Sequence, residues 1–227
     1  MDLNVESDSR ALKISRTMKA RGLNNFSRWT EGMKKIGLIK TSYPNFTHGG
    51  DLAEYVGVVL GDGNISSFPR CERIIISCNS NNSGFVERYA KLTKKLFGKN
   101  PAVSKVKDKN NIRISLYEKK ISARLGIPAG NRKAINYRVP KWISENRANV
   151  IRFLKGLFEA EGSLSIHLPT CTYNFQFCNK NKSLLNAVEH GLKNLGFHPE
   201  IGKVYIRLRK RAEVEKFREM ITFRMYK

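Results

Sequence analysis

The sequence of 227 residues has few acidic side chains and no long apolar run. Asp and Glu number 19 against 42 Lys and Arg, which gives a formal net charge of +23 and a pI near 10.1. Self-repulsion of this size destabilises a compact state unless a polyanion offsets it, so the charge indicates a nucleic-acid partner. No run of about 18 apolar residues is present, which argues against a membrane span, and the first residues are too polar for a secretory leader. We therefore expect a location inside the cell, associated with DNA, in a prokaryotic cytoplasm or nucleoid or in an organelle.

Cysteine is also scarce, and its spacing excludes the commonest zinc pattern. The four cysteines contain no C-x-x-C pair, so zinc is disfavoured, and we expect reduced structural thiols rather than a disulfide framework. Cys71 and Cys171 are 100 residues apart, as are Cys78 and Cys178. This spacing predicts an internal repeat.

Two segments, residues 52–63 and 153–162, share one pattern. Each is an apolar helical run with small residues four positions apart, and each ends in a carboxylate followed by glycine. The small residues are Gly57 and Gly61 in the first segment and Gly156 and Ala160 in the second. Side chains this small let two helix backbones approach closely, so we expect the two segments to pack against each other.

Close packing of these helices would bring Asp62 and Glu161 together. Like charges repel, and a helix C-terminus adds partial negative charge, so the pair needs compensation. Divalent cations supply it, because Mg²⁺ binds one or two carboxylates together with phosphate oxygens and waters. Taken singly, each acid would be an ordinary surface residue beside a glycine that ends a helix. The match at both repeat positions favours a shared metal site.

The remaining pattern predicts an α+β protein with helices on one face of antiparallel sheets. Each repeat has the order helix-strand-strand-helix-strand-strand-helix. Expected strands are 64–67, 73–78, 103–107 and 112–117 in the first repeat, and 163–168, 173–178, 199–201 and 204–209 in the second. The expected divisions are a basic N-terminal extension at 1–48, a first repeat at 49–126, a linker at 127–150 and a second repeat at 151–227.

The two glycine-rich segments resemble the LAGLIDADG motif of homing endonucleases. The two-copy arrangement is similar to the monomeric, pseudo-symmetric members of that family, and the resemblance runs from about Leu52 to the end. It implies two pseudo-symmetric αββαββα repeats with saddle-shaped antiparallel sheets and the motif helices at their interface. It also implies catalytic roles for Asp62 and Glu161, and metal contacts from these acids and from the main-chain carbonyls of Gly61 and Ala160. Mg²⁺ is the expected cofactor, with Mn²⁺ able to substitute and Ca²⁺ binding without cleavage.

Family members often carry a Gln or Lys after the second strand that orients water in the active site. Here the matching positions hold Cys78-Asn79 and Cys178-Asn179. This departure leaves the auxiliary group open. The candidates are Lys180, Asn79, Arg113 and Arg207.

Double-stranded DNA is the expected partner, contacted by the open faces of the two sheets. Polar residues alternate with an apolar set of Ile112, Ile114 and Leu116 in one strand and of Val204, Ile206 and Leu208 in another. Arg reads guanine and Asn or Gln reads adenine in the major groove, whereas many basic side chains contact only phosphate. The expected DNA contacts are Arg73, Lys105, Lys107, Arg113, Ser115, Arg138, Asn174, Gln176, Lys180, Tyr205, Arg207 and Arg209, with Arg132 and Lys133 as further phosphate contacts. In residues 73–77 the polarity does not fit the 100-residue offset.

The N-terminal extension has two possible roles. Arg10, Lys13, Arg16 and Lys19 form a basic helix, and a stretch with Trp29 adds an apolar face. Residues 12–22 weakly resemble short DNA-binding modules attached to homing nucleases. The alternative is a packing or tethering extension.

The leading hypothesis is an intron-encoded, site-specific homing endonuclease that acts as a monomer. The resemblance implies a long asymmetric DNA target, hydrolysis of one phosphodiester per strand and 3′ overhangs. One alternative is an RNA maturase that assists intron splicing without cutting DNA. A regulator that binds DNA without cutting is another, although it would be expected to lose the acids. An intein host is disfavoured, because the chain lacks room for a splicing domain and a terminal His-Asn.

Overall fold

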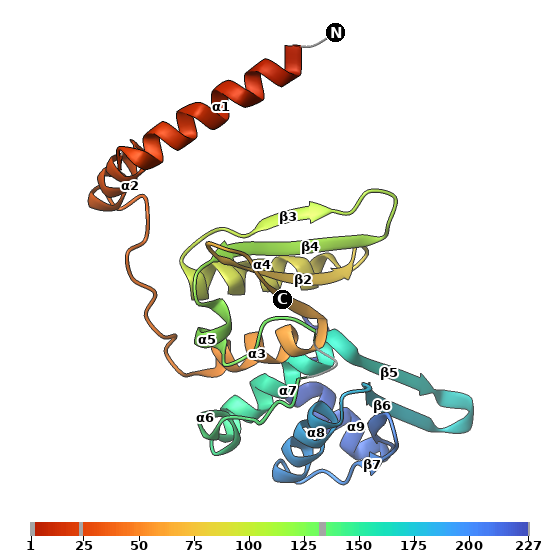
Figure 1. Ribbon diagram of the computed structural model, residues 1–227. Helices are drawn as coiled ribbons and strands as arrows, with labels where there is room; N and C mark the ends of the chain where they lie inside the picture. The colour runs from red at the N-terminus through yellow and green to blue at the C-terminus, as the bar shows by residue number, and fades with distance from the viewer. Residues whose placement is uncertain (1–2, 23–24, 132–134, 227) are drawn as a thin grey trace. The chain divides into compact units, whose positions relative to one another are not determined.

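A computed structural model describes residues 3–22, 25–131 and 135–226, and it divides into two compact units. The first unit, Met1–Pro44, contains the helices α1 (Leu3–Ala20) and α2 (Asn25–Lys35). The second unit, Asn45–Lys227, contains all other elements and the hydrophobic core (Figure 1). Within the described ranges, no helix is both long and apolar enough to cross a membrane.

The second unit is built from two repeats joined by a linker. The first repeat comprises α3 (Gly50–Asp62), β1 (Gly63–Ser67), β2 (Glu72–Asn79), α4 (Ser83–Phe97), β3 (Ala102–Lys105), β4 (Asn111–Glu118) and α5 (Ile121–Leu125). The short helix α6 (Lys141–Ser144) lies in the linker, where the Trp142 ring stacks on His48. The second repeat comprises α7 (Arg147–Glu161), β5 (Gly162–His167), a 3₁₀ turn (Leu168–Thr170), β6 (Thr172–Cys178), α8 (Lys182–Asn194), β7 (Glu200–Ile201), β8 (Tyr205–Leu208) and α9 (Arg211–Met220).

Each repeat folds into one four-stranded antiparallel sheet. The strand orders are β1-β2-β4-β3 and β5-β6-β8-β7, so the two sheets have the same topology. Ile114 and Leu116 are buried in β4, and Ile206 and Leu208 are buried in β8, as the period-two alternation predicts. The predicted α+β class with duplicated repeats is confirmed. The prediction is wrong for Val204, which precedes β8 and is 45% exposed.

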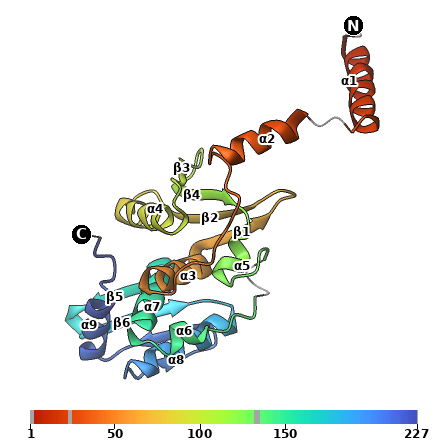
Figure 2. The same cartoon turned by 90° about the vertical axis from the view of Figure 1, so that its left-hand side faces the viewer.

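The two motif helices, α3 and α7, lie side by side between the repeats (Figures 1 and 2). A Cβ on Gly156 would meet the Glu54 carbonyl oxygen and lie 2.7 Å from Val58 N. A Cβ on Gly57 would meet the Phe153 carbonyl oxygen and lie 3.2 Å from Gly156 Cα. The helix backbones therefore touch directly, as the small residues predict, and a larger side chain would push them apart.

The register of the second strand corrects the 100-residue repeat. Gly63 pairs with Ile76 in the first sheet and Gly162 pairs with Phe177 in the second, so equivalent residues are 99 apart at the motif but 101 apart here. The second hairpin is therefore longer by two residues, and the following turn is shorter by two. With the 101-residue offset, buried Ile76 matches buried Phe177, and the polarity conflict in β2 disappears.

The cysteine spacing is consequently not a structural equivalence. Cys78 is buried in β2, whereas Cys178 is exposed at the end of β6. The residue that corresponds to Cys78 in the second repeat is Asn179. No disulfide links the cysteines, all of which are free.

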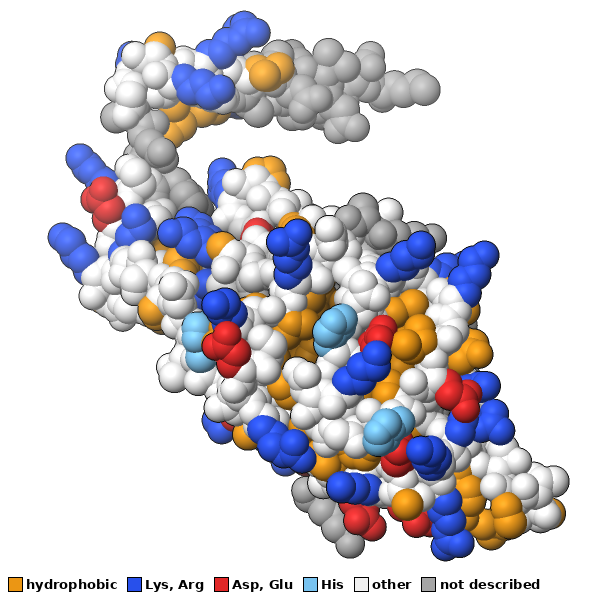
Figure 3. Space-filling view, turned by 90° about the horizontal axis from the view of Figure 1, so that it is seen from below, with side chains coloured by type: hydrophobic (Ala, Val, Ile, Leu, Met, Phe, Trp, Pro, Cys, Tyr) orange, Lys and Arg blue, Asp and Glu red, His pale blue; other side chains and the backbone are white. Residues whose placement is uncertain are grey.

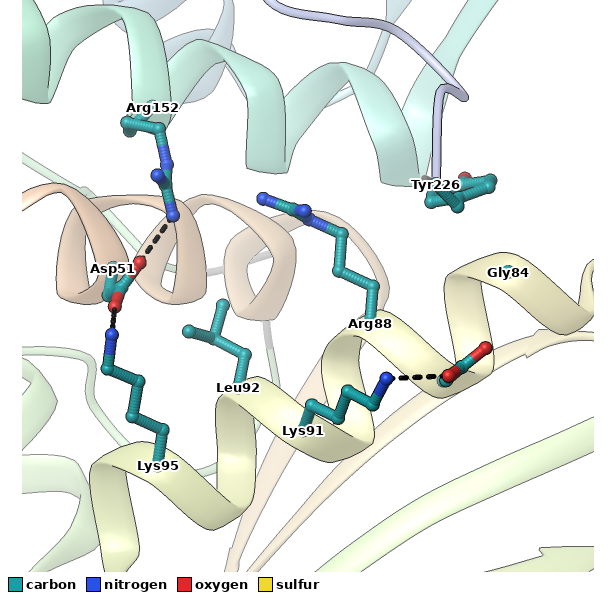
Figure 4. Close-up of a pocket in the computed structure, with 9 residues that line it drawn as sticks. Asp51, Gly84, Arg88, Lys91, Leu92, Lys95, Arg152 and Tyr226 are labelled. Carbon is teal, nitrogen blue, oxygen red and sulfur yellow. Dashed lines mark hydrogen bonds and ion pairs between the residues drawn. The ribbon is translucent and has the colours of Figure 1, made fainter.

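An ionic cluster around the buried Glu54 carboxylate ties α3 to α4 and α7. Glu54 is 0% exposed and accepts two hydrogen bonds from Arg88, at 2.5 and 2.8 Å. Arg152 on α7 lies 2.7 Å from Glu54 and donates to Asp51 at 2.5 Å (Figure 4). Lys95 completes the cluster at 2.5 Å from Asp51, and the two cations lower the pKa of the Asp51 carboxyl.

Glu159 is buried as well, where it holds the C-terminal segment. The Arg224 backbone N–H donates to Glu159 at 2.7 Å, and the Tyr226 hydroxyl also donates to this carboxylate. Lys155, one turn earlier, donates to the carbonyl oxygens of Ile221 and Thr222 at 2.8 and 2.9 Å. Burial raises the pKa of Glu159 and lowers that of Lys155.

We predict that Gly156→Ala destabilises the second unit by about 1–3 kcal/mol, because the added methyl meets backbone atoms of α3 that have no room to move. Chemical denaturation monitored by circular dichroism measures the loss. Gly49→Ser is the matched control: its Cβ meets nothing within 4 Å, and a serine here can cap α3. Equal stability of Gly156→Ala and the wild type would contradict the close helix contact.

Candidate active site at the ends of the motif helices

Asp62 and Glu161 are the last residues of α3 and α7, and each is followed by a glycine that begins a strand. Gly63 and Gly162 have extended backbones, with φ of −88° and −80°, so positive φ does not explain them. Sterics do: a Cβ on Gly63 would lie 2.6 Å from Val59 Cα. Glycine lets the chain turn directly from helix to strand, which leaves each acid at the corner between the two elements.

The packing of the helices brings these two corners together. A Cβ on Gly61 would meet the Ala160 side chain and lie 3.4 Å from Glu161 Cγ. Asp62 follows Gly61 directly, and both acids are half-buried. The four residues predicted to form the metal site, Gly61, Asp62, Ala160 and Glu161, therefore lie at one place where the two repeats meet.

Asn179 is a site residue that the sequence prediction did not include among its candidates. Its Nδ2 donates to Glu161 Oε1 at 3.4 Å, while its Oδ1 accepts a 2.8 Å hydrogen bond from the Asn181 backbone N–H. Because Oδ1 faces the Asn181 N–H, the Nδ2 donor of the Asn179 amide faces the Glu161 carboxylate. The register of β6 was the missing signal, because it places the residue after Cys178 next to the end of α7.

Cys78 occupies the corresponding position beside Asp62. Gly63 pairs with Ile76, so Cys78 lies close to the end of α3. Burial, together with the negative charge of Asp62, raises the pKa of the Cys78 thiol to about 11. One acid is thus accompanied by an amide and the other by a protonated thiol, so the two halves differ chemically.

An open cleft of about 650 Å³ lies against the helix ends. Gly61 and Glu161 line it together with Lys180, the one predicted DNA contact among its lining residues. The other lining residues are Leu60, Asn64, Asn131, Cys178, Asn179, Asn181, Leu184 and Val204. The lining thus combines four asparagines, one acid and one cation with the apolar side chains of Leu60, Leu184 and Val204.

The donor set fits a hard divalent cation. Within the described part of the chain, no group of three or more His, Cys, Asp or Glu side chains could enclose a metal ion. Two carboxylates beside main-chain carbonyls instead offer oxygen donors and leave coordination positions open. Mg²⁺, Mn²⁺ and Ca²⁺ prefer oxygen, and Mg²⁺ normally completes its shell with water and substrate phosphate.

The open faces of the sheets carry several of the predicted DNA contacts. Arg113 pairs with Ser77 across β2 and β4, and Gln176 pairs with Arg207 across β6 and β8. The Arg207 guanidinium lies over the Tyr205 ring and donates to Glu200 at 2.8 Å. The other predicted contacts on these faces are Arg73, which donates to Tyr117, and Ser115 and Asn174.

The remaining predicted contacts lie outside these faces. Lys105 is exposed but pairs with Ile112, so its register places it toward the face that the helices cover. The residues Lys107, Arg138, Lys180 and Arg209 are exposed in connecting segments. Arg132 and Lys133 are outside the described residues. Lys and Arg side chains are spread over the face shown in Figure 3, with Asp and Glu between them.

Comparison with known proteins places the repeats in a recognised fold. Residues 148–222 match the model of the LAGLIDADG-like domain. No curated protein sequence matches the chain. The homing endonuclease I-DmoI in complex with DNA and Mn has a similar structure, with 23% identity and a TM-score of 0.54, covering 76% of this chain and 96% of that one.

Two further structures show how widely this fold occurs. I-DmoI in complex with DNA and Ca aligns over 76% of this chain and 88% of its own, at 23% identity and a TM-score of 0.53. The N-terminal LAGLIDADG domain of DUF199/WhiA aligns over 79% and 86%, at 18% identity and a TM-score of 0.54. These similarities confirm the two-repeat LAGLIDADG fold, while the chemistry has to be argued from the site.

We predict that alkylating reagents modify Cys78 far more slowly than Cys171 and Cys178. A pKa raised to about 11 leaves very little of the Cys78 thiol as thiolate at pH 8, and burial restricts access further. Mass spectrometry of tryptic peptides after timed iodoacetamide treatment measures the rates.

The control is Asp62→Asn, which removes the negative charge and should speed the reaction at Cys78 without changing that at Cys171. An unchanged Cys78 rate in this variant would show that the thiol and Asp62 are not neighbours.

Proposed function

We propose that this protein, which has the LAGLIDADG fold with a LAGLIDADG-like domain at residues 148–222, is a site-specific DNA endonuclease dependent on divalent cations. The observation that carries the proposal is the meeting of Asp62 and Glu161 at the ends of two helices in direct backbone contact. Holding two carboxylates close together costs free energy. Bound cations would offset this cost, and the positive charge of the protein favours a phosphate ligand at the same place.

Residues at the helix ends would bind the cations, and residues beside them would position the carboxylate and the phosphate. Asp62, Glu161 and the carbonyls of Gly61 and Ala160 would hold the cations, and Asn179 would keep one oxygen of Glu161 oriented. Cations bound there would stabilise negative charge on the reacting phosphate and make water more acidic. Lys180, at the edge of the same cleft, is placed to contact a phosphate.

DNA recognition would use the polar faces of the two sheets. The faces are unlike, since Arg113 and Ser115 in one correspond to Tyr205 and Arg207 in the other, so the target should be long and not palindromic. Arg207 would exchange Glu200 for DNA, because the two share an exposed pair that costs little to break. A single chain carries both sheets, one for each half of the DNA target, so we propose that it acts as a monomer. Cleavage would leave 3′ overhangs and would serve intron homing.

The direct test is cleavage of a randomised DNA library by the purified protein with Mg²⁺, followed by sequencing of the ends. Paired cuts at one sequence, with 3′ overhangs, are expected. Retention of structured RNA with no DNA cut would favour the maturase alternative, and DNA binding without a cut would favour a regulator. Mn²⁺ should replace Mg²⁺, and Ca²⁺ should support binding alone.

We predict that Asp62→Asn and Glu161→Gln each reduce cleavage by about 10²–10³-fold, the usual range for losing a group that stabilises the reacting charge. Both substitutions keep side-chain size, so DNA affinity measured in Ca²⁺ should stay within a few-fold of the wild type. Supercoiled plasmid carrying the selected target reports nicked and linear products separately.

Glu87→Gln is the matched control, since Glu87 is an exposed acid on α4 that pairs with Lys91. It should cut at the wild-type rate. Full cutting by either active-site variant would remove the proposed site.

A further inference from the structure

The N-terminal unit has helices but no buried side chain among those whose exposure the structure describes. These are residues 10, 12–22 and 27–44. Five large apolar side chains are mostly exposed: Leu12 at 57%, Ile14 at 55%, Trp29 at 52%, Ile36 at 65% and Leu38 at 73%. Helices of 18 and 11 residues are marginal in water when tertiary packing does not support them.

Repulsion between like charges lowers the stability of these helices further. Between residues 10 and 40 the only acid is Glu31, and the cations are Arg10, Lys13, Arg16, Lys19, Arg21, Arg28, Lys34, Lys35 and Lys40. In α1 the cations recur every third residue, and like charges at this spacing repel on a helix. A polyanion reverses that penalty. Duplex DNA, with one negative charge per about 1.7 Å of its axis, offers the required density.

We propose that residues 10–40 fold onto the phosphate backbone of duplex DNA, so that α1 and α2 become stable only when the DNA is bound. This inference rests on DNA as the partner in the proposed function, but it does not depend on cleavage. The segment would add affinity without reading sequence, since phosphate contacts position a protein without specifying bases. Covering Leu12, Ile14, Ile36 and Leu38 in the bound state would add an apolar contribution to the electrostatic one.

Hydrogen exchange of the full-length protein tests the proposal, using a duplex of random sequence in EDTA so that no cutting occurs. Backbone amides in residues 10–22 and 27–40 should exchange rapidly in the free protein and at least tenfold more slowly with DNA. Helices α3 and α7 serve as internal references and should be protected in both states. Protection of the N-terminal unit without DNA, or rapid exchange with DNA bound, would overturn the proposal.

Charge variants separate phosphate binding from general charge effects. Arg16→Gln with Lys19→Gln should weaken binding to random duplex several-fold and reduce the slope of log K against log salt by up to about two. The control pair, Lys216→Gln with Arg218→Gln, removes the same charge from α9, which packs against the sheet through Phe217. Equal effects from both pairs would overturn the assignment, as would stronger protection by anionic vesicles or duplex RNA than by DNA.

Deletion of residues 1–44 should lower DNA affinity and leave specific cleavage by the second unit detectable. The two proposals can therefore fail separately. Specific cutting with no exchange protection removes only the folding proposal, whereas protection without cutting by the full chain removes only the nuclease.

Discussion

The direct contact between the backbones of α3 and α7 determines what the rest of the second unit can do. Gly57 and Gly156 each face backbone atoms of the opposite helix at distances that no side chain would allow. With the helices this close, the residues at their C-terminal ends have no freedom to avoid each other. The closeness of the helix ends that carry Asp62 and Glu161 is therefore a consequence of packing, and hydrophobic burial along the whole helix pair stabilises it.

Near the opposite end of the helix pair, an ionic cluster fixes how the two helices are aligned along their axes. Apolar packing is not directional, so contacts between glycines and aliphatic side chains fix the alignment of two helices along their axes only weakly. The Glu54 cluster opposes sliding: its carboxylate is fully buried, and Arg88 and Arg152 reach it from two other helices. Moving α7 along α3 would separate the buried Glu54 carboxylate from Arg152, which is unfavourable. An ionic cluster at one end can thus maintain the alignment of two acids at the other.

The sequence predicts the secondary-structure elements and the location of the site, but not the strand register of the second hairpin. Period-two alternation in β4 and the repeated acid-glycine ends of the motif helices predict both sheets and the location of the site. The 100-residue offset, by contrast, hides an insertion in the second hairpin and a deletion in the next turn that cancel each other. Asn179 was consequently compared with Asn79 instead of Cys78. The burial of Glu54 is not predictable from the sequence for another reason: its partners Arg88 and Arg152 are distant in sequence, and a charge on an apolar helix gives no sign of them.

Duplication followed by divergence leaves the site symmetric in backbone and asymmetric in chemistry. Each half supplies a carboxylate from a helix end, yet one half adds the Asn179 amide and the other adds the buried Cys78 thiol. The Asn179 amide donates to Glu161, whereas the Cys78 thiol donates to the Ile112 carbonyl oxygen at 3.8 Å. Under the proposed function, two DNA strands would meet unequal halves and need not react at equal rates. The difference arises at a position that the fold treats as equivalent, which makes it a property of this chain rather than of the fold.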